Sequence, residues 1–380
     1  MDKKCLNRFF LINLFLILVV MMSCSSGKDG ETKGDEPLNE VKVGAWYFGG
    51  WSFPPDANGH TFHISPTLTT QFSNREPVWG WREDKPEIMV EQINYAADAG
   101  LSFWGFCWYE NSLVSNPALM DHLNIALDLY LQAPNRKRLD FCLLSCHPVS
   151  PATWDTLCDR LIPYFKESNY LKVDGKPLLI FFNTDEVISG MGNIESTKLA
   201  LESFREKARK AGVGEIMIGA RTAPMAIDVN YQNKYKACGF DFLTTYQNAD
   251  DGRLTPGAND YEFLIKGDRK AWTEISNHTD LPYIPTMGTG YDMRPWAADH
   301  PNQPASDYWY VGATPERIAG HLKEAMEWTK DNSSKVLGNL LFIYAWNENG
   351  EGGWLTPTKS EANARLEAIK EVINEKNKKK

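Results

Sequence analysis

Hydrophobic and polar positions along the chain form two alternating kinds of segment. Short apolar runs rich in β-branched and aromatic residues, typical of buried strands, are followed by longer stretches in which apolar positions recur with helical spacing. Such runs predict strands at residues 41–48, 101–109, 139–147, 177–183, 215–221, 241–247, 283–290 and 340–348. The helical spacing predicts helices at residues 85–100, 116–133, 151–168, 196–212, 227–239, 261–277, 314–332 and 360–378.

This alternation favours a parallel sheet, because parallel strands need a crossover between them and are buried on both faces. Thr314 before Pro315 is a helix start signal, and Gly100 and Gly212 are stop signals. No glycine-rich dinucleotide-binding loop follows the first strand. The pattern therefore predicts an α/β fold, a single (β/α)8 TIM barrel over residues 41–376 with a long loop after its first strand.

The start of the chain predicts export. A basic leader precedes an apolar run at residues 9–22 that is short for a membrane span, which is the layout of a signal peptide over residues 1–23. "VMMSC" resembles a bacterial lipobox and makes Cys24 the expected lipidation site, while an ordinary signal peptide or an anchor helix stays open. Residues 24–40 are rich in Gly, Ser and charge and predict a flexible tether.

The charge balance limits the partners. The chain carries 40 basic and 49 acidic residues, so nothing in its charge favours nucleic acid or an anionic membrane surface. We expect a monomer that touches the membrane only through its N-terminal lipid, at the outer membrane, the cell surface or in the periplasm.

Cysteine and histidine spacing predicts neither a disulfide framework nor a metal site. The cysteines after the leader are expected to be small core residues, and they are Cys107, Cys142, Cys146, Cys158 and Cys238. His147 lies at the end of a predicted strand and is a candidate site residue. His122 and His321 lie within helical patterns, where we expect them to be solvated.

Polar and aromatic residues gather at the predicted carboxyl ends of the strands, where barrel enzymes hold their active sites. Tryptophan and tyrosine suit sugars, because the CH faces of a sugar stack on aromatic rings and its hydroxyls need polar partners. Packing in the barrel core is the alternative for each tryptophan. The candidate binding residues for an oligosaccharide or polysaccharide are Trp46, Tyr47, Trp108, Tyr109, His147, Asn183, Arg221, Tyr246, Asp292, Trp296, Trp346, Asn347 and Trp354.

Two carboxylates follow the last predicted strand, Glu348 and Glu351 in "FIYAWNENGEGGW". Cleavage of a glycosidic bond needs one carboxylic acid to protonate the leaving oxygen and a second carboxylate at the reacting carbon. Glutamates three apart are common on solvated helices, but these two lie among glycines directly after a buried strand. They are the candidate catalytic residues.

The motif "AWNENGEGGWLTPT" resembles the signature of the glycoside hydrolase family 99-like superfamily, which includes WbsX-like glycosyltransferases. "VGAWYFGGW", "DAGLSFWGFCWY", "YLKVDGKPLLIFFN" and "GFDFLTTYQ" also resemble segments of that superfamily in the same order. The resemblance spans residues 41–358. It implies a (β/α)8 barrel and, for the hydrolases, endo-acting cleavage of α-mannosides with retention and without a cofactor or metal.

The resemblance also implies residue roles. Glu348 would deprotonate the sugar 2-hydroxyl, and Glu351 would act as general acid and then as base. Tyr47 and Tyr246 would line the catalytic subsite. The chain departs from the signature at Asn349, where the family has a second tryptophan, and at Thr356, where it has an acid. Both departures bear on subsite geometry and on the preference for mannose.

Three functions follow from these patterns. A secreted, lipid-anchored glycoside hydrolase fits the predicted export signal and the glutamate pair best. A glycan-binding lipoprotein without catalysis stays open, since a barrel fold does not fix an activity. A glycosyltransferase is the third, although no glycine-rich loop opens a helix to hold a nucleotide phosphate.

Overall fold

The computed structural model describes residues 40–52, 63–110, 117–222, 229–302 and 306–378. The predicted signal peptide, the lipidation site Cys24 and the tether up to residue 39 lie outside the described residues. All that follows concerns the described part of the chain.

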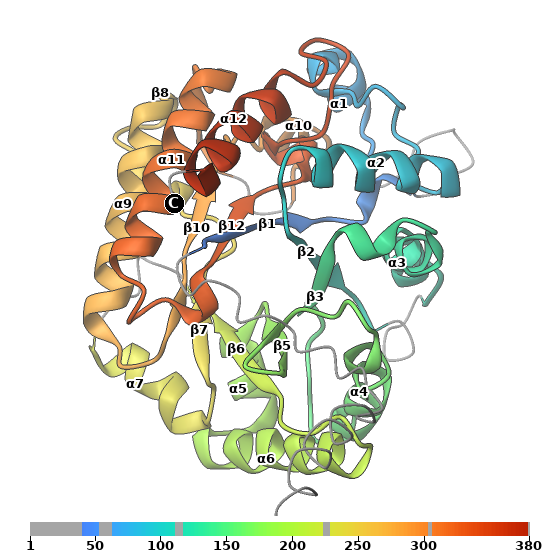
Figure 1. Ribbon diagram of the computed structural model, residues 1–380, viewed down its shortest axis with the longest axis vertical. Helices are drawn as coiled ribbons and strands as arrows, with labels where there is room; N and C mark the ends of the chain where they lie inside the picture. The colour runs from blue at the N-terminus through green and yellow to red at the C-terminus, as the bar shows by residue number, and fades with distance from the viewer. Residues whose placement is uncertain (1–39, 53–62, 111–116, 223–228, 303–305, 379–380) are drawn as a thin grey trace, which may run out of the picture. The chain divides into compact units, whose positions relative to one another are not determined.

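Parallel strands form a ring at the centre of the fold, in the order β10, β12, β1, β2, β3, β5, β6, β7 and β9 (Figure 1). They are β1 (Lys42–Tyr47), β2 (Phe103–Trp108), β3 (Asp140–Ser145), β5 (Lys176–Phe181), β6 (Met217–Arg221), β7 (Phe242–Thr244), β9 (Tyr283–Ile284), β10 (Thr286–Gly288) and β12 (Leu340–Tyr344). β9 and β10 are consecutive in the chain, so the order closes on itself. This confirms the predicted (β/α)8 barrel.

The seventh predicted strand is divided at Pro285. Proline has no N–H to donate to a neighbouring strand, and β9 therefore pairs with β7 while β10 pairs with β12. The Pro285 carbonyl still accepts a hydrogen bond of 2.9 Å from the backbone nitrogen of Phe342, which keeps the seventh and eighth barrel positions joined.

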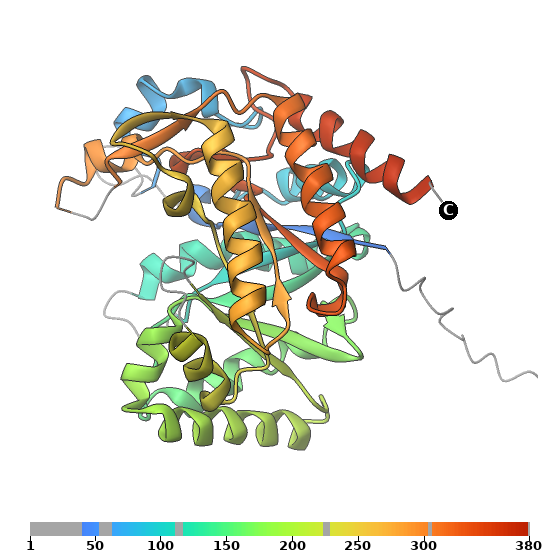
Figure 2. The same cartoon turned by 90° about the vertical axis from the view of Figure 1, so that its left-hand side faces the viewer.

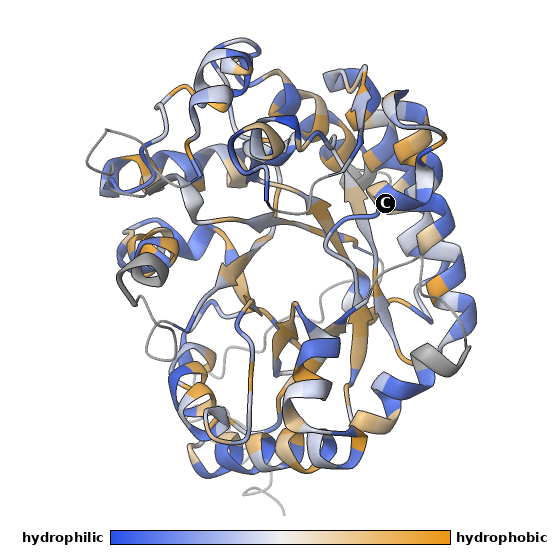
Figure 3. Ribbon diagram, turned by 180° about the vertical axis from the view of Figure 1, so that it is seen from behind, coloured by the Kyte–Doolittle hydropathy of each residue, from blue (hydrophilic) through white to orange (hydrophobic). Residues whose placement is uncertain are grey.

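Helices cover the outside of the ring. The predicted helices correspond to α2 (Pro86–Asp98), α3 (Pro117–Gln132), α4 (Trp154–Leu161), α6 (Ile194–Lys210), α7 (Val229–Cys238), α9 (Tyr261–His278), α11 (Pro315–Asp331) and α12 (Ala364–Lys378). Short additions lie in the loops: α1 (Pro66–Thr70), α5 (Thr184–Met191), α8 (Ala249–Gly252), α10 (Arg294–Asp299), β4 (Lys172–Val173), β8 (Gly257–Asp260) and β11 (Tyr308–Val311). Figure 3 shows apolar strands inside and polar residues on the outward faces of the helices.

Aromatic rings fill the barrel interior against small residues. Trp46 on β1 stacks on Phe342 of β12, with ring centroids 3.6 Å apart and an interplanar angle of 6°. A Cβ on Gly105 of β2 would lie 2.5 Å from the Trp46 ring, so this strand position must stay without a side chain. Large rings on some strands therefore fit because glycines on their neighbours leave room for them.

His321 corrects one prediction. It lies on α11, but it is buried rather than solvated, and its Nε2 is 2.7 Å from Oδ2 of Asp268 on α9. The same Asp268 oxygen accepts a hydrogen bond from the backbone nitrogen of Gly288 on β10 at 2.8 Å. The pair therefore joins two helices that lie side by side in Figure 2 to the strand beneath them.

Of the helices described, none is long and apolar enough to cross a membrane.

Candidate active site

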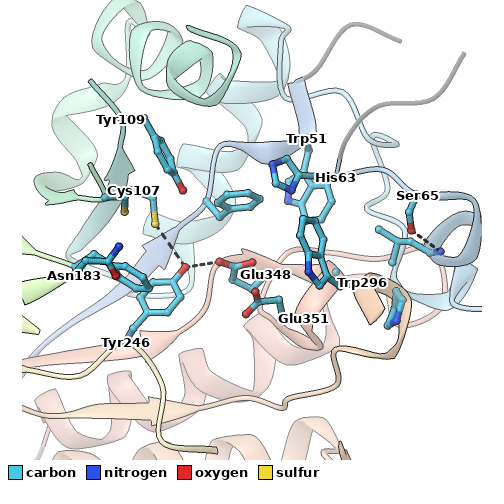
Figure 4. A pocket seen from close by; sticks show the side chains of 16 residues that line it. Trp51, His63, Ser65, Cys107, Tyr109, Asn183, Tyr246, Trp296, Glu348 and Glu351 are labelled. Carbon is cyan, nitrogen blue, oxygen red and sulfur yellow. Dashed lines mark hydrogen bonds between the residues drawn. The ribbon is translucent and has the colours of Figure 1, made fainter. Parts of the chain in front are cut away.

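The carboxyl ends of the barrel strands and their loops surround a cavity of about 280 Å³. This volume lies just below the roughly 300–1,000 Å³ found for ligand pockets. Its walls contain many aromatic side chains and carry two carboxyl groups (Figure 4). The lining residues are Phe48, Trp51, His63, Ser65, Leu68, Cys107, Tyr109, Cys146, Phe182, Asn183, Tyr246, Pro295, Trp296, Glu348, Gly350 and Glu351.

A hairpin after β12 carries the two acids. Its strands β13 (Asn347–Glu348) and β14 (Gly353–Trp354) pair antiparallel, and Gly352 between them has a φ of 83°, which favours glycine. A Cβ on Gly352 would also lie 2.6 Å from the backbone nitrogen of Asp292. The glycines around the acids therefore permit the tight turn that brings both carboxyl groups to the cavity.

Each carboxyl group accepts a hydrogen bond from a tyrosine hydroxyl. Tyr246, in the loop after β7, donates to Oε1 of Glu348. Tyr344, the last residue of β12, donates to Oε2 of Glu351 at 2.5 Å. Burial raises the pKa of both tyrosines, so both hydroxyls keep their protons and remain donors at neutral pH.

The two glutamates also influence each other's charge. Burial raises the pKa of Glu348 well above its ordinary value, and the nearby Glu351 and Cys107 raise it further. Burial raises the pKa of Glu351, against the lowering effect of the hydrogen bond from Tyr344. Because two buried carboxylates repel each other, ionisation of one favours the protonated form of the other. One acid and one base are then available together.

Two distant loops build an aromatic wall of the cavity. His63, from the loop after β1, stacks on Trp296 of α10, with ring centroids 5.5 Å apart and an interplanar angle of 17°. Both the backbone nitrogen and Oγ1 of Thr67 on α1 donate to the carboxylate of Asp299 on α10 at 2.9 Å, which ties the loops together. Burial, with nearby His300, lowers the pKa of His63 to about 3, so its ring is neutral.

Six of the residues singled out in the sequence line this cavity. They come from the ends of different strands and from the last hairpin, as a barrel active site requires. They are Tyr109, Asn183, Tyr246, Trp296, Glu348 and Glu351.

Several lining residues were not among the candidates. Phe48, Trp51 and His63 belong to the long loop after β1, whose length and tryptophan content were the available signal. Cys107 and Cys146 were expected in the core, but both line the cavity. Successive side chains of β2 point to opposite faces of the sheet. Cys107 therefore faces the barrel interior, and its neighbour Trp108 faces the helices.

Four candidates are fully buried behind the cavity instead of lining it, and they are Trp46, Tyr47, Trp346 and Asn347. Trp46 belongs to the stacked barrel interior. The Tyr47 hydroxyl faces Glu83 and Gln92, and Trp346 donates from Nε1 to Oε1 of Gln92 at 2.8 Å. Both faces of a barrel strand are buried, so position at a strand end did not distinguish these side chains from those facing the cavity.

Three further candidates lie around the cavity but do not line it. Trp108 packs edge-on against Tyr164 on the helix side of β2, in a separate hollow that shares Tyr109 with the cavity. His147 is buried, which lowers its pKa. The guanidinium of Arg221 lies 4.5 Å from the ring centroid of Phe182, which does line the cavity.

Asp292 and Trp354 support the hairpin from behind. Asp292 forms ion pairs with Arg75 and, at 2.8 Å, with Arg294, and its backbone nitrogen donates to the carbonyl of Glu351 at 2.6 Å. Trp354 lies under the guanidinium of Arg365, 3.8 Å from the ring centroid. These two candidates therefore stabilise the hairpin and do not line the cavity.

Arg75, from the long loop after β1, binds the same hairpin. Its side chain is buried, and Nη1 lies 3.1 Å from the carbonyl oxygen of Asp292, 3.3 Å from that of Asn349 and 3.5 Å from that of Gly350. Asn349 donates in return from Nδ2 to the Arg75 carbonyl at 2.7 Å. The turn between the two glutamates is thus clamped by a cation from a loop 274 residues away.

The two departures from the family signature contact each other. Asn349 and Thr356 are both buried, and Nδ2 of Asn349 lies 3.2 Å from Oγ1 of Thr356. The threonine hydroxyl can donate back to Oδ1 of Asn349 at 3.3 Å. Neither residue lines the cavity. The substitutions form a matched pair inside the hairpin and leave both glutamates facing the cavity.

Among the residues that the structure describes, no group of three or more His, Cys, Asp or Glu side chains is placed to hold a metal ion.

Two buried carboxyl groups and aromatic side chains around a cavity at the strand ends of a barrel are features that enzymes acting on glycans share. Residues 81–369 match the family described as glycosyltransferase WbsX, and the chain belongs to that family. The resemblance noted in the sequence is therefore confirmed.

Curated relatives include a protein named "Uncharacterized protein WxcX" from Xanthomonas campestris pv. campestris, which is 22% identical over 324 residues. The alignment covers 76% of this chain and 41% of that protein. The same protein in a second strain of this bacterium gives the same identity and coverage. The chain thus spans about two fifths of the length of these relatives.

Solved structures with a similar fold include a glycoside hydrolase-like protein, with a TM-score of 0.59 and 16% identity, over 89% of this chain and 95% of that one. The GH99 endo-alpha-mannosidase from Bacteroides thetaiotaomicron gives a TM-score of 0.59 at 14% identity, over 88% of this chain and 97% of its own. At these identities the likeness shows the fold, the (β/α)8 barrel.

Proposed function

We propose that this protein is a glycoside hydrolase that cleaves α-mannoside-like or related linkages of a polysaccharide, acting within the chain and with retention. The observation that carries the proposal is the pair Glu348 and Glu351. Both line a small aromatic cavity, each accepts a hydrogen bond from a tyrosine hydroxyl, and burial raises the pKa of both.

In the first step Glu348 takes the proton of the sugar 2-hydroxyl, and that oxygen bonds to the anomeric carbon. The bond from the anomeric carbon to the leaving oxygen breaks as Glu351 gives that oxygen its proton. In the second step Glu351 takes a proton from water, and the water oxygen bonds to the anomeric carbon. The bond from the 2-oxygen then breaks, and Glu348 returns its proton to that oxygen. Two inversions give overall retention.

The neighbouring side chains suit these roles. Each glutamate accepts a hydrogen bond from one tyrosine hydroxyl, which stabilises its ionised form, and the assignment of Glu348 as base and Glu351 as acid follows the family resemblance. Trp296 lines the cavity and stacks on His300, with ring centroids 3.8 Å apart, and on neutral His63, which makes an aromatic wall of the kind that suits a sugar. The small volume suits one sugar residue at the reacting position, with the rest of the polymer outside.

A transferase is the second candidate, and the family description favours it. The same glutamate pair would serve it if a sugar hydroxyl took the place of water.

We propose that the protein is a surface lipoprotein anchored through Cys24. An exported protein meets polysaccharides and not the nucleotide sugars of the cytoplasm, which favours the hydrolase.

The test is a product assay of the purified protein against α-mannans, other plant and host glycans, and nucleotide sugars. The proposal expects new reducing ends from at least one polymer, absent in Glu348→Gln and Glu351→Gln variants that still fold. Transfer from a nucleotide sugar without polymer cleavage would assign the transferase. Binding without any turnover would assign a glycan-binding protein.

A further inference from the structure

A third acid, Glu83, is completely buried beside the active site and takes no part in the chemistry proposed above. It belongs to the loop after β1 and faces the hairpin that carries Glu348 and Glu351, with a relative exposure of 0%. Its Oε2 is 3.0 Å from the hydroxyl of Tyr47 and 2.9 Å from Nδ2 of Asn347. Within the described part of the chain, no ion pair involves Glu83. A carboxylate in this position would be a buried charge without a cation.

The hydrogen bonds around Tyr47 require one more proton than an ionised Glu83 allows. Trp346 can only donate from Nε1, and its partner at 2.8 Å is Gln92, which fixes the amide oxygen of Gln92 toward both Trp346 and Tyr47. The Tyr47 hydroxyl thus lies 3.1 Å from one acceptor, Gln92 Oε1, and 3.0 Å from another, Glu83 Oε2. A hydroxyl has a single proton and can satisfy one of them.

A protonated Glu83 resolves this conflict. Its O–H then donates to Tyr47, and Tyr47 donates to Gln92. The Glu83 carboxyl group still accepts from Asn347. Every contact now has one donor and one acceptor.

We propose that Glu83 is a positioning residue of the active site and that it acts as a neutral carboxylic acid, a hydrogen-bond donor to Tyr47. Its effect on turnover rests on the function proposed above, whereas its protonation does not. The direction of the pKa agrees with the geometry, because burial raises the pKa of Glu83 to about 8.

Glu83 reaches the catalytic residue through Asn347, which directly precedes Glu348. The Asn347 side chain donates from Nδ2 to the Phe48 carbonyl at 2.6 Å and accepts from the Phe48 backbone nitrogen at 2.7 Å. The Asn347 carbonyl accepts from Nε1 of Trp51 at 2.7 Å. Phe48, Trp51 and Glu348 all line the cavity. Asn347 therefore fixes the positions of one cavity wall and of the Glu348 side chain together. Ionisation of Glu83 would leave a buried charge unpaired and disturb the contacts of Asn347 with Phe48 and Trp51.

The sign of the pH effect follows from linkage. Glu83 has a folded pKa of about 8, above the ordinary 4.5 of an exposed glutamate. The stability that its proton contributes is therefore fully present below the unfolded pKa and is lost as the pH rises through the folded pKa. Asn347 and Tyr47 are the groups that face this carboxyl group, and burial raises the pKa of Tyr47 as well, so the phenol stays protonated across this range.

Glu83→Gln tests the proposal, because glutamine copies the neutral acid with an N–H donor for Tyr47 and an oxygen that accepts from Asn347. Thermal unfolding of the full protein is measured from about pH 5 to about pH 9 for the wild type, Glu83→Gln, Glu83→Ala and the exposed control Glu87→Gln. We expect the melting temperature of Glu83→Gln, relative to that of the wild type, to increase as the pH rises. The melting temperature of Glu87→Gln should match that of the wild type at every pH.

The kinetic arm compares kcat over the same range. We expect Glu83→Gln to keep wild-type kcat at neutral pH and to retain activity near pH 9, where the wild type declines, and Glu83→Ala to lose kcat at every pH. A Glu83→Gln variant that fails to fold, matches Glu83→Ala, or keeps a constant melting-temperature gap would overturn the proposal. If the wild type hydrolyses nothing, the proposed function fails, and the unfolding series still decides the state of Glu83.

Discussion

The hydroxyl of Tyr246 donates a hydrogen bond to Oε1 of Glu348, joining the loop after the sixth barrel strand to the hairpin after the eighth. The two residues are 102 positions apart in the chain. Because burial keeps the phenol protonated, the bond stabilises Glu348 in its ionised form, the state that a base needs. The barrel thus assembles a donor and a base that no local sequence pattern connects.

Tyr246→Phe removes this donor and leaves the ring in place. We expect kcat to fall roughly 10- to 100-fold with little change in KM, since a hydrogen bond to a charged group contributes about 1.5–3 kcal/mol. Steady-state kinetics on the polymer that the wild type cleaves measures this. Tyr283→Phe, which alters a buried tyrosine outside the cavity lining, is the control, and an unchanged kcat in Tyr246→Phe would contradict the role.

Arg75→Ala should disorder the hairpin that carries Glu348 and Glu351 and lower the free energy of unfolding of the protein. Removal of one partner from a buried ion pair costs about 3–5 kcal/mol, and here three backbone carbonyls also lose a donor. Arg294→Ala is the matched control, because Arg294 pairs with the same Asp292 but its side chain is 43% exposed. That variant should lose at most about 1 kcal/mol. Urea unfolding compares the two, and equal losses would contradict the clamp.

The buried pair of His321 and Asp268 predicts a second pH dependence. Burial lowers the pKa of His321, but the hydrogen bond with Asp268 and the nearby carboxylate of Glu324, 3.9 Å from Nδ1, outweigh burial and the net pKa is raised. The stability that the protonated ring contributes is present below its unfolded pKa and is lost as the pH rises through the folded value.

His321→Leu should therefore destabilise the protein by about 3–5 kcal/mol at low pH, because Asp268 loses its buried partner. The difference from the wild type should shrink as the pH rises. Urea unfolding at several pH values gives the comparison, with His278→Gln on the neighbouring helix as the control. A difference that stays constant with pH would mean that the ring is neutral in the folded protein.

Thr356→Val isolates the pair that departs from the family signature. The side chain keeps its shape, but Asn349 loses a hydrogen-bond partner, which costs about 0.5–1.5 kcal/mol of unfolding free energy. Because Asn349 is also held by Arg75, we expect kcat to stay within about twofold. A large loss of kcat with normal stability would show instead that this pair controls the reacting position.

The sequence predicted the barrel well because its signal is periodic. Apolar runs and helical spacing recur along the chain. Within the described residues, the seventh predicted strand is divided at Pro285, a residue visible in advance, and the eighth ends at Tyr344 before the separate hairpin strand Asn347–Glu348. The acids Glu348 and Glu351 were also accessible to sequence reasoning, since glycines beside a buried strand predict a turn and not a helix face.

Side-chain direction was the part that the sequence could not predict. Trp46 and Tyr47 are neighbours on β1, yet one fills the barrel interior and the other faces Glu83 and Gln92, and hydropathy is the same on both faces of such a strand. His321 shared a helical pattern with solvated residues, and its burial depends on Asp268, 53 residues earlier. Arg75 and Glu83 lie in a loop without periodicity, so only the folded chain reveals what they hold.

In the proposed reaction, Glu348 and Glu351 together cleave a glycosidic bond. The most direct measurement is kcat/KM on the cleaved polymer for the wild type, Glu348→Gln, Glu351→Gln and the exposed control Glu371→Gln. We predict losses of at least about 100-fold in the first two variants, at unchanged melting temperature, and none in the control. Cleavage at the wild-type rate by either active-site variant would contradict the account.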